Sequence, residues 1–247
     1  MIAAVEKQKF VYVLNRDAAA NLTISSPLEA HKSHNVVFSA AALDCGFDNP
    51  VFATIELDYS EVDQDPSGEA AQGAQKQLVY YELDLGLNHV VRKWSDAVDN
   101  GANLLIPVPG GGDGPGGVLV AAENFLLYRH QGHEELRAVL PRRDVLPADR
   151  GVLIVSYAAH KKKAYSFFLL QSEYGDIYKA TLQHSGDTVT NLTVKYFDTL
   201  PPTASLAVLK TGFLFAASEF GSHALYQFIR RPGHKKCCAG PVRRALC

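Results

Sequence analysis

The chain has 247 residues, 47% of them hydrophobic, and a formal net charge of −2. This apolar fraction excludes a disordered polyelectrolyte, and the absence of a three- or seven-residue period excludes a collagen or coiled-coil rod. No apolar run approaches the ~20 residues of a membrane-spanning helix, so no membrane contact is expected.

Basic residues are concentrated at the C-terminal end. Residues 229–247 hold six of the 24 basic residues and no acidic one, which leaves 18 basic against 26 acidic residues in 1–228, a net charge of −8. Such an acidic body disfavours wrapping of nucleic acid, which needs clustered lysine and arginine. The tail has no hydrophobic period. We therefore expect a folded domain at 1–228 and a disordered basic tail at 229–247, for which a nucleic-acid or nuclear-localisation role stays open.

One local pattern recurs along the chain: an apolar strand that ends in glutamate and is followed by a second strand. In chain order the segments read IAAVE, VFATIE, VLVAAE, LLQSE and FAASE, and they end at Glu6, Glu56, Glu123, Glu173 and Glu219. The intervals are 50, 67, 50 and 46 residues. The long interval contains a polar, Gly- and Ala-rich stretch at 58–76, which we interpret as an inserted mobile surface loop.

Each repeat contains about four short β-rich runs, the size of a β-propeller blade. The runs are continuously apolar rather than alternating, as expected for strands buried on both faces. Five glutamates span about four and a half blades, so the sequence predicts an all-β fold, a partial propeller of four to five blades in an open ring. Its only Trp, Trp94, is followed by Ser95, so the WD signature is missing. We interpret the five glutamates as a structural device at the blade turns, with an active-site role as the alternative.

Patterns for catalysis and metal binding are weak. His31 and His34, like His130 and His133, are spaced i, i+3 without an accompanying acid or cysteine at metal-ligand spacing. The glycine-rich run 109–117 lacks the Gly-Lys-Ser/Thr ending of a phosphate loop and is interpreted as a blade-connecting loop. The vicinal cysteines of the tail do not match zinc-ligand spacing. No enzyme activity, cofactor or metal is predicted.

Several segments resemble the splicing factor 3b subunit 3 family: DPSGEAA, YYELDLGLNHVVRKWS, GDIYKATL, KYFDTLPP and VLKTGFLFAASEFG. The resemblance runs from Met1 to about Phe228. It implies part of the first of three seven-bladed propellers, with Met1 at a position internal to the family protein. Related families are the damage-specific DNA-binding protein 1 and the large subunit of the cleavage and polyadenylation specificity factor. The basic tail departs from the family, so we expect a fragment of a longer gene.

The resemblance implies a nuclear scaffold of splicing factor 3b in the U2 small nuclear ribonucleoprotein. Its implied partners are the HEAT-repeat subunit and small subunits, with RNA contact at most weak or indirect. Candidate contact loops are 58–76 and 109–117. The candidate basic cluster, for which solvated surface charge is the alternative, is Arg142, Arg143, His160, Lys161, Lys162 and Lys163.

Two other functions stay open. One is a nucleic-acid-binding propeller of the DNA-damage-binding type, and the other is a truncated product without a function of its own. Because an open ring leaves blade faces uncovered, we also expect the isolated chain to aggregate or to need a partner.

Overall fold

The computed structural model describes residues 1–45, 48–162, 165–210, 212–218, 220–230 and 237–241. Within them the regular secondary structure is almost entirely β-strand, as predicted. The strands are β1 (Ile2–Val5), β2 (Gln8–Val11), β3 (Leu14–Arg16), β4 (Leu22–Ile24), β5 (Leu28–Glu29), β6 (Asn35–Ala42), β7 (Val51–Asp58), β8 (Gln77–Asp84), β9 (His89–Ala97), β10 (Leu104–Pro107), β11 (Val118–Ala122), β12 (Phe125–Arg129), β13 (Leu136–Val139), β14 (Ile154–Lys162), β15 (Tyr165–Ser172), β16 (Asp176–Ser185), β17 (Thr188–Thr199), β18 (Thr203–Leu209), β19 (Phe213–Ser218), β20 (Ala224–Arg230) and β21 (Cys237–Pro241).

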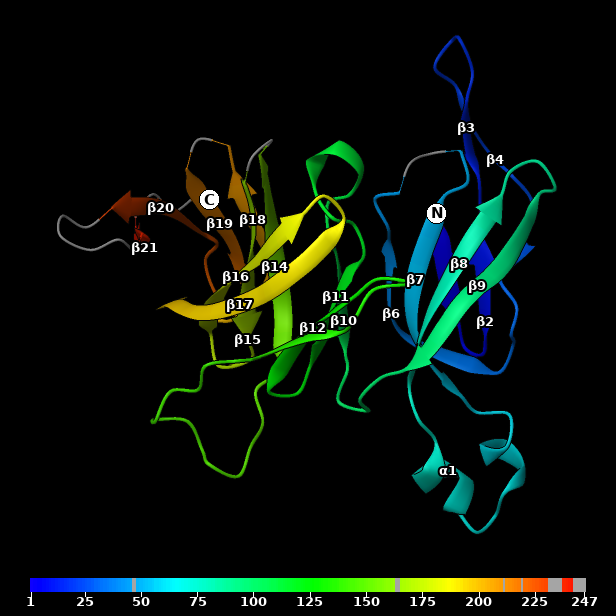
Figure 1. Cartoon of the computed structure of the whole chain (residues 1–247), viewed down its shortest axis with the longest axis horizontal. Helices are drawn as coiled ribbons and strands as arrows, with labels where there is room; N and C mark the ends of the chain where they lie inside the picture. Colours follow the sequence, from blue (N-terminus) through cyan, green and yellow to red (C-terminus); the bar gives the residue numbers. More distant parts are fainter. Residues whose placement is uncertain (46–47, 163–164, 211, 219, 231–236, 242–247) are drawn as a thin grey trace.

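Strands β3 and β4 form a separate two-stranded sheet, and the other strands form five successive antiparallel sheets, here called blades. Blade I is β1-β2-β5, blade II β6-β7-β8-β9, blade III β10-β11-β12-β13, blade IV β14-β15-β16-β17 and blade V β18-β19-β20-β21. Figure 1 shows blades I and II on one side of the molecule, blades IV and V on the other, and blade III between them. The first strands of blades II to V, namely β6, β10, β14 and β18, contact one another in that order.

The apolar cores lie between neighbouring blades, which explains the continuous apolar runs. In β8, Leu78 and Tyr80 face blade III, whereas Val79 and Tyr81 face blade I. Side chains alternate across a strand, so a strand between two cores must be apolar at every position. The same division occurs in β11 and β15: the two faces of each strand belong to different clusters. The prediction of strands buried on both faces is confirmed.

The ring is open, as the partial-propeller prediction requires. Each four-stranded sheet in the described residues is built from consecutive strands, and blade I skips only the β3–β4 hairpin. None of the sheets combines N-terminal with C-terminal strands. Among the described residues, four sheets have four strands, blade I has three and the β3–β4 sheet has two. Glu6 lies between β1 and β2 as Glu123 lies between β11 and β12, so β1 corresponds to the second strand of a blade.

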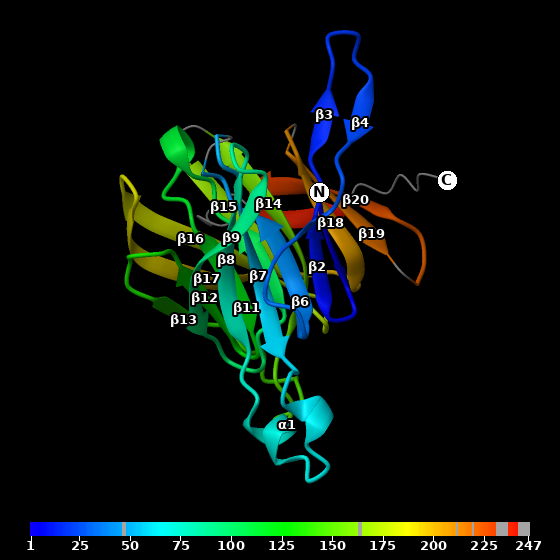
Figure 2. The ribbon, with the colours of Figure 1, turned by 90° about the vertical axis from the view of Figure 1, so that its right-hand side faces the viewer.

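Two segments project from opposite ends of the molecule (Figures 1 and 2). One is the β3–β4 hairpin, on which Leu14, Leu22 and Ile24 are exposed. The other is the predicted inserted loop between β7 and β8, which contains a 3₁₀ turn (Val62–Gln64) and the short helix α1 (Glu69–Gly73). Asp65 shapes this loop because its carboxylate accepts hydrogen bonds from the amides of Ser67 (2.9 Å) and Ala70 (2.8 Å).

The C-terminal end is described in part. Strand β21 pairs with β20 from Tyr226↔Pro241 to Arg230↔Cys237, and residues 231–236 and 242–247 lie outside the described residues. The division of the chain at Phe228 into domain and tail stays a prediction. No helix within the described ranges is long and apolar enough to cross a membrane.

Candidate partner-binding surfaces

The recurring glutamates occupy two kinds of environment. Three are exposed in turns, which join the second and third strands in blades III and IV and β1 to β2 in blade I. One lies inside a strand, and Glu219 lies outside the described residues. The exposed ones are Glu6, Glu123 and Glu173, and the buried one is Glu56, within β7. The difference arises because β7 continues two residues beyond Glu56 before the inserted loop begins.

Backbone hydrogen bonds tie these turns to the ends of the fourth strands in blades III and IV. The carbonyl of Asn124 accepts a hydrogen bond from the amide of Leu140 (2.9 Å), and the carbonyl of Gly175 accepts one from Leu200 (2.9 Å). Asn124 and Gly175 have φ angles of 70° and 85°, the left-handed region that asparagine and glycine tolerate best. A hydrogen-bonding role of the glutamate side chains at the turns therefore stays a prediction.

Glu56 forms a buried ion pair between blades I and II. Its Oε2 lies 2.9 Å from Nζ of Lys9, and both side chains are at most 1% exposed. Asn35 and Thr54 also donate hydrogen bonds to this carboxylate. Burial alone would raise the pKa of Glu56, but these two hydrogen bonds and the Lys9 charge hold that pKa below its ordinary value. Glu56 therefore joins blades I and II through a buried ion pair and is not accessible to a partner.

The predicted basic cluster divides into two groups. Arg143 donates from Nε to Asp176, which is fully buried at the start of β16 (2.8 Å to Oδ2). This pairing raises the pKa of Arg143 further and anchors the segment between blades III and IV. Arg142 is exposed, and its guanidinium donates to the carbonyl of Arg150 (2.5 Å).

The second group lies at the other end of β14. Lys161 Nζ lies 3.1 Å from Oδ2 of Asp44 and 3.0 Å from Oδ2 of Asp113, and these carboxylates raise its pKa. The His160 ring lies 5.0 Å from that of Phe167. The side chain of Lys162 and all of Lys163 lie outside the described residues.

The two groups cannot form one patch. The turn that precedes Asp176 lies beside Ile154, the first residue of β14, because Ile154 pairs with Ser172. Lys161 is seven positions further along that strand, about 23 Å at roughly 3.3 Å per residue. A single partner surface of ordinary size can cover both groups only by spanning the whole length of blade IV.

The glycine-rich loop 109–117 joins β10 to β11 within blade III, so it is not a connection between blades. Asp44 holds this loop through the amide of Gly110 (3.1 Å), and that hydrogen bond, together with Lys161, lowers the pKa of Asp44. Gly117 has a φ of 78°, and a Cβ there would lie 2.7 Å from the carbonyl oxygen of Arg129. The loop is thus a fixed surface beside Lys161 and suits recognition by shape.

The histidine pairs show no catalytic arrangement. The rings of His130 and His133 stack at 4.6 Å with an interplanar angle of 5°, and burial lowers the pKa of His130. Within the described part of the chain, no group of three or more His, Cys, Asp or Glu side chains is placed to hold a metal ion.

Two features had no clear signal in the sequence. Lys9 is only 1% exposed, although lysine in a short strand is normally placed on the surface. Gln171 is fully buried and ties blade IV to blade V: its Oε1 accepts from the amide of Thr203 (3.0 Å), and its Nε2 donates to the carbonyl of Pro201 (3.1 Å). Both residues act across an interface between sheets, which a local pattern does not reveal.

Residues 1–238 match the family model described as "RSE1/DDB1/CPSF1 first beta-propeller". Spliceosome-associated protein 130 A of Arabidopsis thaliana is 68% identical over 228 residues, which is 92% of this chain and 19% of that protein. Probable splicing factor 3B subunit 3 of Dictyostelium discoideum is 57% identical over 239 residues, 92% of this chain and 19% of that protein.

Splicing factor 3B subunit 3 of Drosophila melanogaster is 55% identical over 230 residues, again 92% of this chain and 19% of the relative. The chain thus spans about a fifth of the length of these relatives. Their names describe splicing proteins and not catalysed reactions. The resemblance seen in the sequence is confirmed: the chain belongs to the RSE1/DDB1/CPSF1 first beta-propeller family, and within it the chain is similar to splicing factor 3B subunit 3.

Proposed function

We propose that this chain acts in pre-mRNA splicing as a propeller scaffold of splicing factor 3b within the U2 small nuclear ribonucleoprotein. The observation that carries the proposal is the 68% identity to Spliceosome-associated protein 130 A over 92% of the chain. On this proposal the chain works in the nucleus, through protein–protein contacts and without catalysis. Its partners are the HEAT-repeat subunit and the small subunits of splicing factor 3b.

The fold supports such a role because its loops are held by fixed contacts. Asp44 and Lys161 position the loop 109–117 beside the end of β14, and Asp65 shapes the inserted loop. Rigid sheets that present shaped loops are typical of propellers that hold several partners. We keep these two loops, together with Arg142 and Lys161, as the candidate contacts.

Co-precipitation with the HEAT-repeat subunit tests the proposal. The tagged full chain is expected to retain that subunit, and Arg142→Glu or Lys161→Ala is expected to weaken retention. Arg16→Glu is the matched control, because Arg16 is exposed on the β3–β4 hairpin away from the candidate contacts. Folded chain that retains none of the subunit contradicts the proposal.

The alternative of a nucleic-acid-binding propeller has less support. The body carries a net charge of −8, and Lys161 is already paired with two carboxylates. A salt titration separates the two functions, since affinity through phosphates falls steeply with salt concentration.

Truncation after Phe228 tests the proposed division into a domain and a basic tail. An unchanged melting temperature supports the boundary at 228. A lower melting temperature shows instead that β21, which pairs with β20, stabilises blade V and that the domain extends beyond residue 228.

A further inference from the structure

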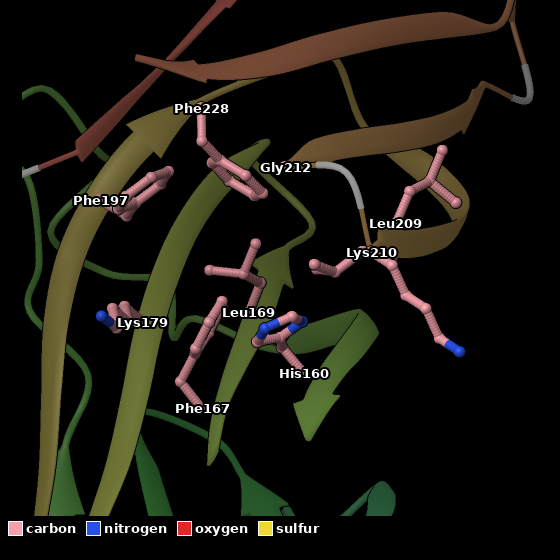
Figure 3. A pocket seen from close by; sticks show the side chains of 10 residues that line it. His160, Phe167, Leu169, Lys179, Phe197, Leu209, Lys210, Gly212 and Phe228 are labelled. Carbon is pink, nitrogen blue, oxygen red and sulfur yellow. The ribbon is translucent and has the colours of Figure 1, made fainter. Parts of the chain in front are cut away.

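The interface between blades IV and V opens into a pocket near the ends of β14 and β18. The pocket has a volume of about 350 Å³. Figure 3 shows its lining side chains, which come from β14 to β17 on one wall and from β18, β20 and the β18–β19 turn on the other. It is the outer continuation of the core shared by these two blades.

The walls of the pocket are apolar. Phe167 and Leu169 come from blade IV, and Val208 and Phe228 from blade V. The rings of Phe197 and Phe228 meet edge to face, with centroids 6.0 Å apart. Such walls can bury a large apolar side chain, and the polar side chains among the described lining residues are confined to His160, Lys179 and Lys210.

Cationic side chains flank the apolar walls. Lys179 and Lys210 lie on opposite sides of the pocket, and Figure 3 shows both with the ammonium directed away from its centre. Lys179 Nζ lies 4.8 Å from the ring centroid of Phe167. Lys195, exposed on β17, pairs with Lys179 across the sheet and adds a third charge. Strand β17 carries one acidic residue, Asp198, which like Lys179 takes part in an interaction of its own.

We propose that this pocket binds one large apolar side chain, Phe or Leu, of an acidic peptide segment in a partner protein. The apolar walls select the buried side chain, and the flanking lysines attract Asp or Glu residues on either side of it. This mode resembles other peptide sites in which pockets read single side chains and surface charges read the flanks. The site does not depend on a role in splicing, so its test is independent of the co-precipitation.

Selection from a phage-displayed library of random 12-residue peptides on the immobilised full chain tests this site. The enriched peptides are expected to share a Phe or Leu with acidic residues within three positions of it. Their binding to the soluble chain is then measured by fluorescence anisotropy. A selection without enrichment, or with enriched peptides that lack acidic residues, overturns the proposal.

Variants place the binding in the pocket. Leu209→Asp puts a carboxylate at the pocket wall and is expected to weaken binding by about tenfold or more, the loss typical of an interface hot spot. Leu87→Asp is the matched control, because Leu87 is 78% exposed on the β8–β9 turn. Lys210→Glu is expected to weaken binding by about threefold and to reduce its salt dependence, and Arg16→Glu is its control.

The circular dichroism melting temperature of each variant distinguishes a folding defect from a binding defect. If Leu209→Asp has the melting temperature of the wild type and still binds the peptides with wild-type affinity, the pocket is not their binding site. If a single-stranded RNA oligonucleotide binds the pocket in a Lys210-dependent way and the peptides do not, the proposed peptide ligand is wrong.

Discussion

The interface between blades I and II combines an apolar core with a buried ion pair, whereas the interface between blades III and IV is built from apolar and aromatic side chains. In the first, the Lys9–Glu56 pair is buried beside Tyr81, with Lys9 Nζ 5.5 Å from the ring centroid. In the second, residues such as Leu119 and Phe168 fill the space between the sheets. An apolar interface supplies free energy for many similar packings, while a buried ion pair is stable only when both charges meet. Blade I is therefore held by apolar packing together with an ion pair that fits one arrangement, and blade IV by apolar packing.

The largest expected effect is the loss of one partner of the buried pair. Lys9→Met leaves the carboxylate of Glu56 without its countercharge and should lower the free energy of unfolding by about 4 kcal/mol. Urea denaturation measures this change. The double variant Lys9→Met with Glu56→Leu should recover much of the loss, because no unpaired charge remains. If the free energy of unfolding of Lys9→Met lies within about 1 kcal/mol of the wild-type value, the ion pair does not hold the two blades together.

A cavity in the apolar interface should lower the free energy of unfolding by less than the unpaired charge does. Leu119→Ala removes a fully buried side chain between blades III and IV and should lower the free energy of unfolding by about 3 kcal/mol. Leu119→Met, which nearly preserves the volume, is the control and should cost below about 1.5 kcal/mol. Equal losses for the two variants would contradict an interface held by packing.

The side-chain amide of Gln171 differs from both the buried ion pair and the apolar side chains, since it is polar but uncharged. Gln171→Ala leaves the amide of Thr203 and the carbonyl of Pro201 unpaired at the junction of blades IV and V, which should cost about 2 kcal/mol. Gln131→Ala, at an exposed turn position, is the control and should leave the denaturation midpoint unchanged. A loss as small as that of the control would show that water replaces the side chain.

The exposed ion pair between Lys32 and Asp58 should have the smallest effect on the free energy of unfolding. Despite partial burial, hydrogen bonds from Lys32 and Ser60 lower the pKa of Asp58 to about 2 from its ordinary 3.8. The stabilisation is therefore complete above pH ~4 and is lost as the pH falls towards 2. Because the pair is more than a third exposed, Asp58→Asn should cost below about 1 kcal/mol at pH 7. Urea midpoints at pH 7 and pH 2.5 should show the difference between variant and wild type shrinking at the lower pH.

The sequence predicts the architecture better than the sites. The spacing of glutamate-tipped apolar runs predicts blades because each run is a local feature, and the structure places one sheet at each repeat. The environment of Glu56 could not be predicted, because its partner Lys9 belongs to another sheet 47 positions away. For the same reason the sequence does not separate Arg143 from Lys161, and the two lie at opposite ends of blade IV. The pocket beside Lys210 forms only where two sheets meet, so no single segment encodes it.

Each core of this molecule is shared by two adjacent sheets, and this arrangement has a consequence for how the molecule opens. Blade III has a core on both sides, whereas blade I shares one with blade II alone. Amide hydrogen exchange should thus be slowest in β11 and β12 and faster in β1 and β2. A terminal sheet can detach by breaking a single interface, so opening proceeds stepwise inward. Loss of the middle sheet would instead separate the two halves of the molecule.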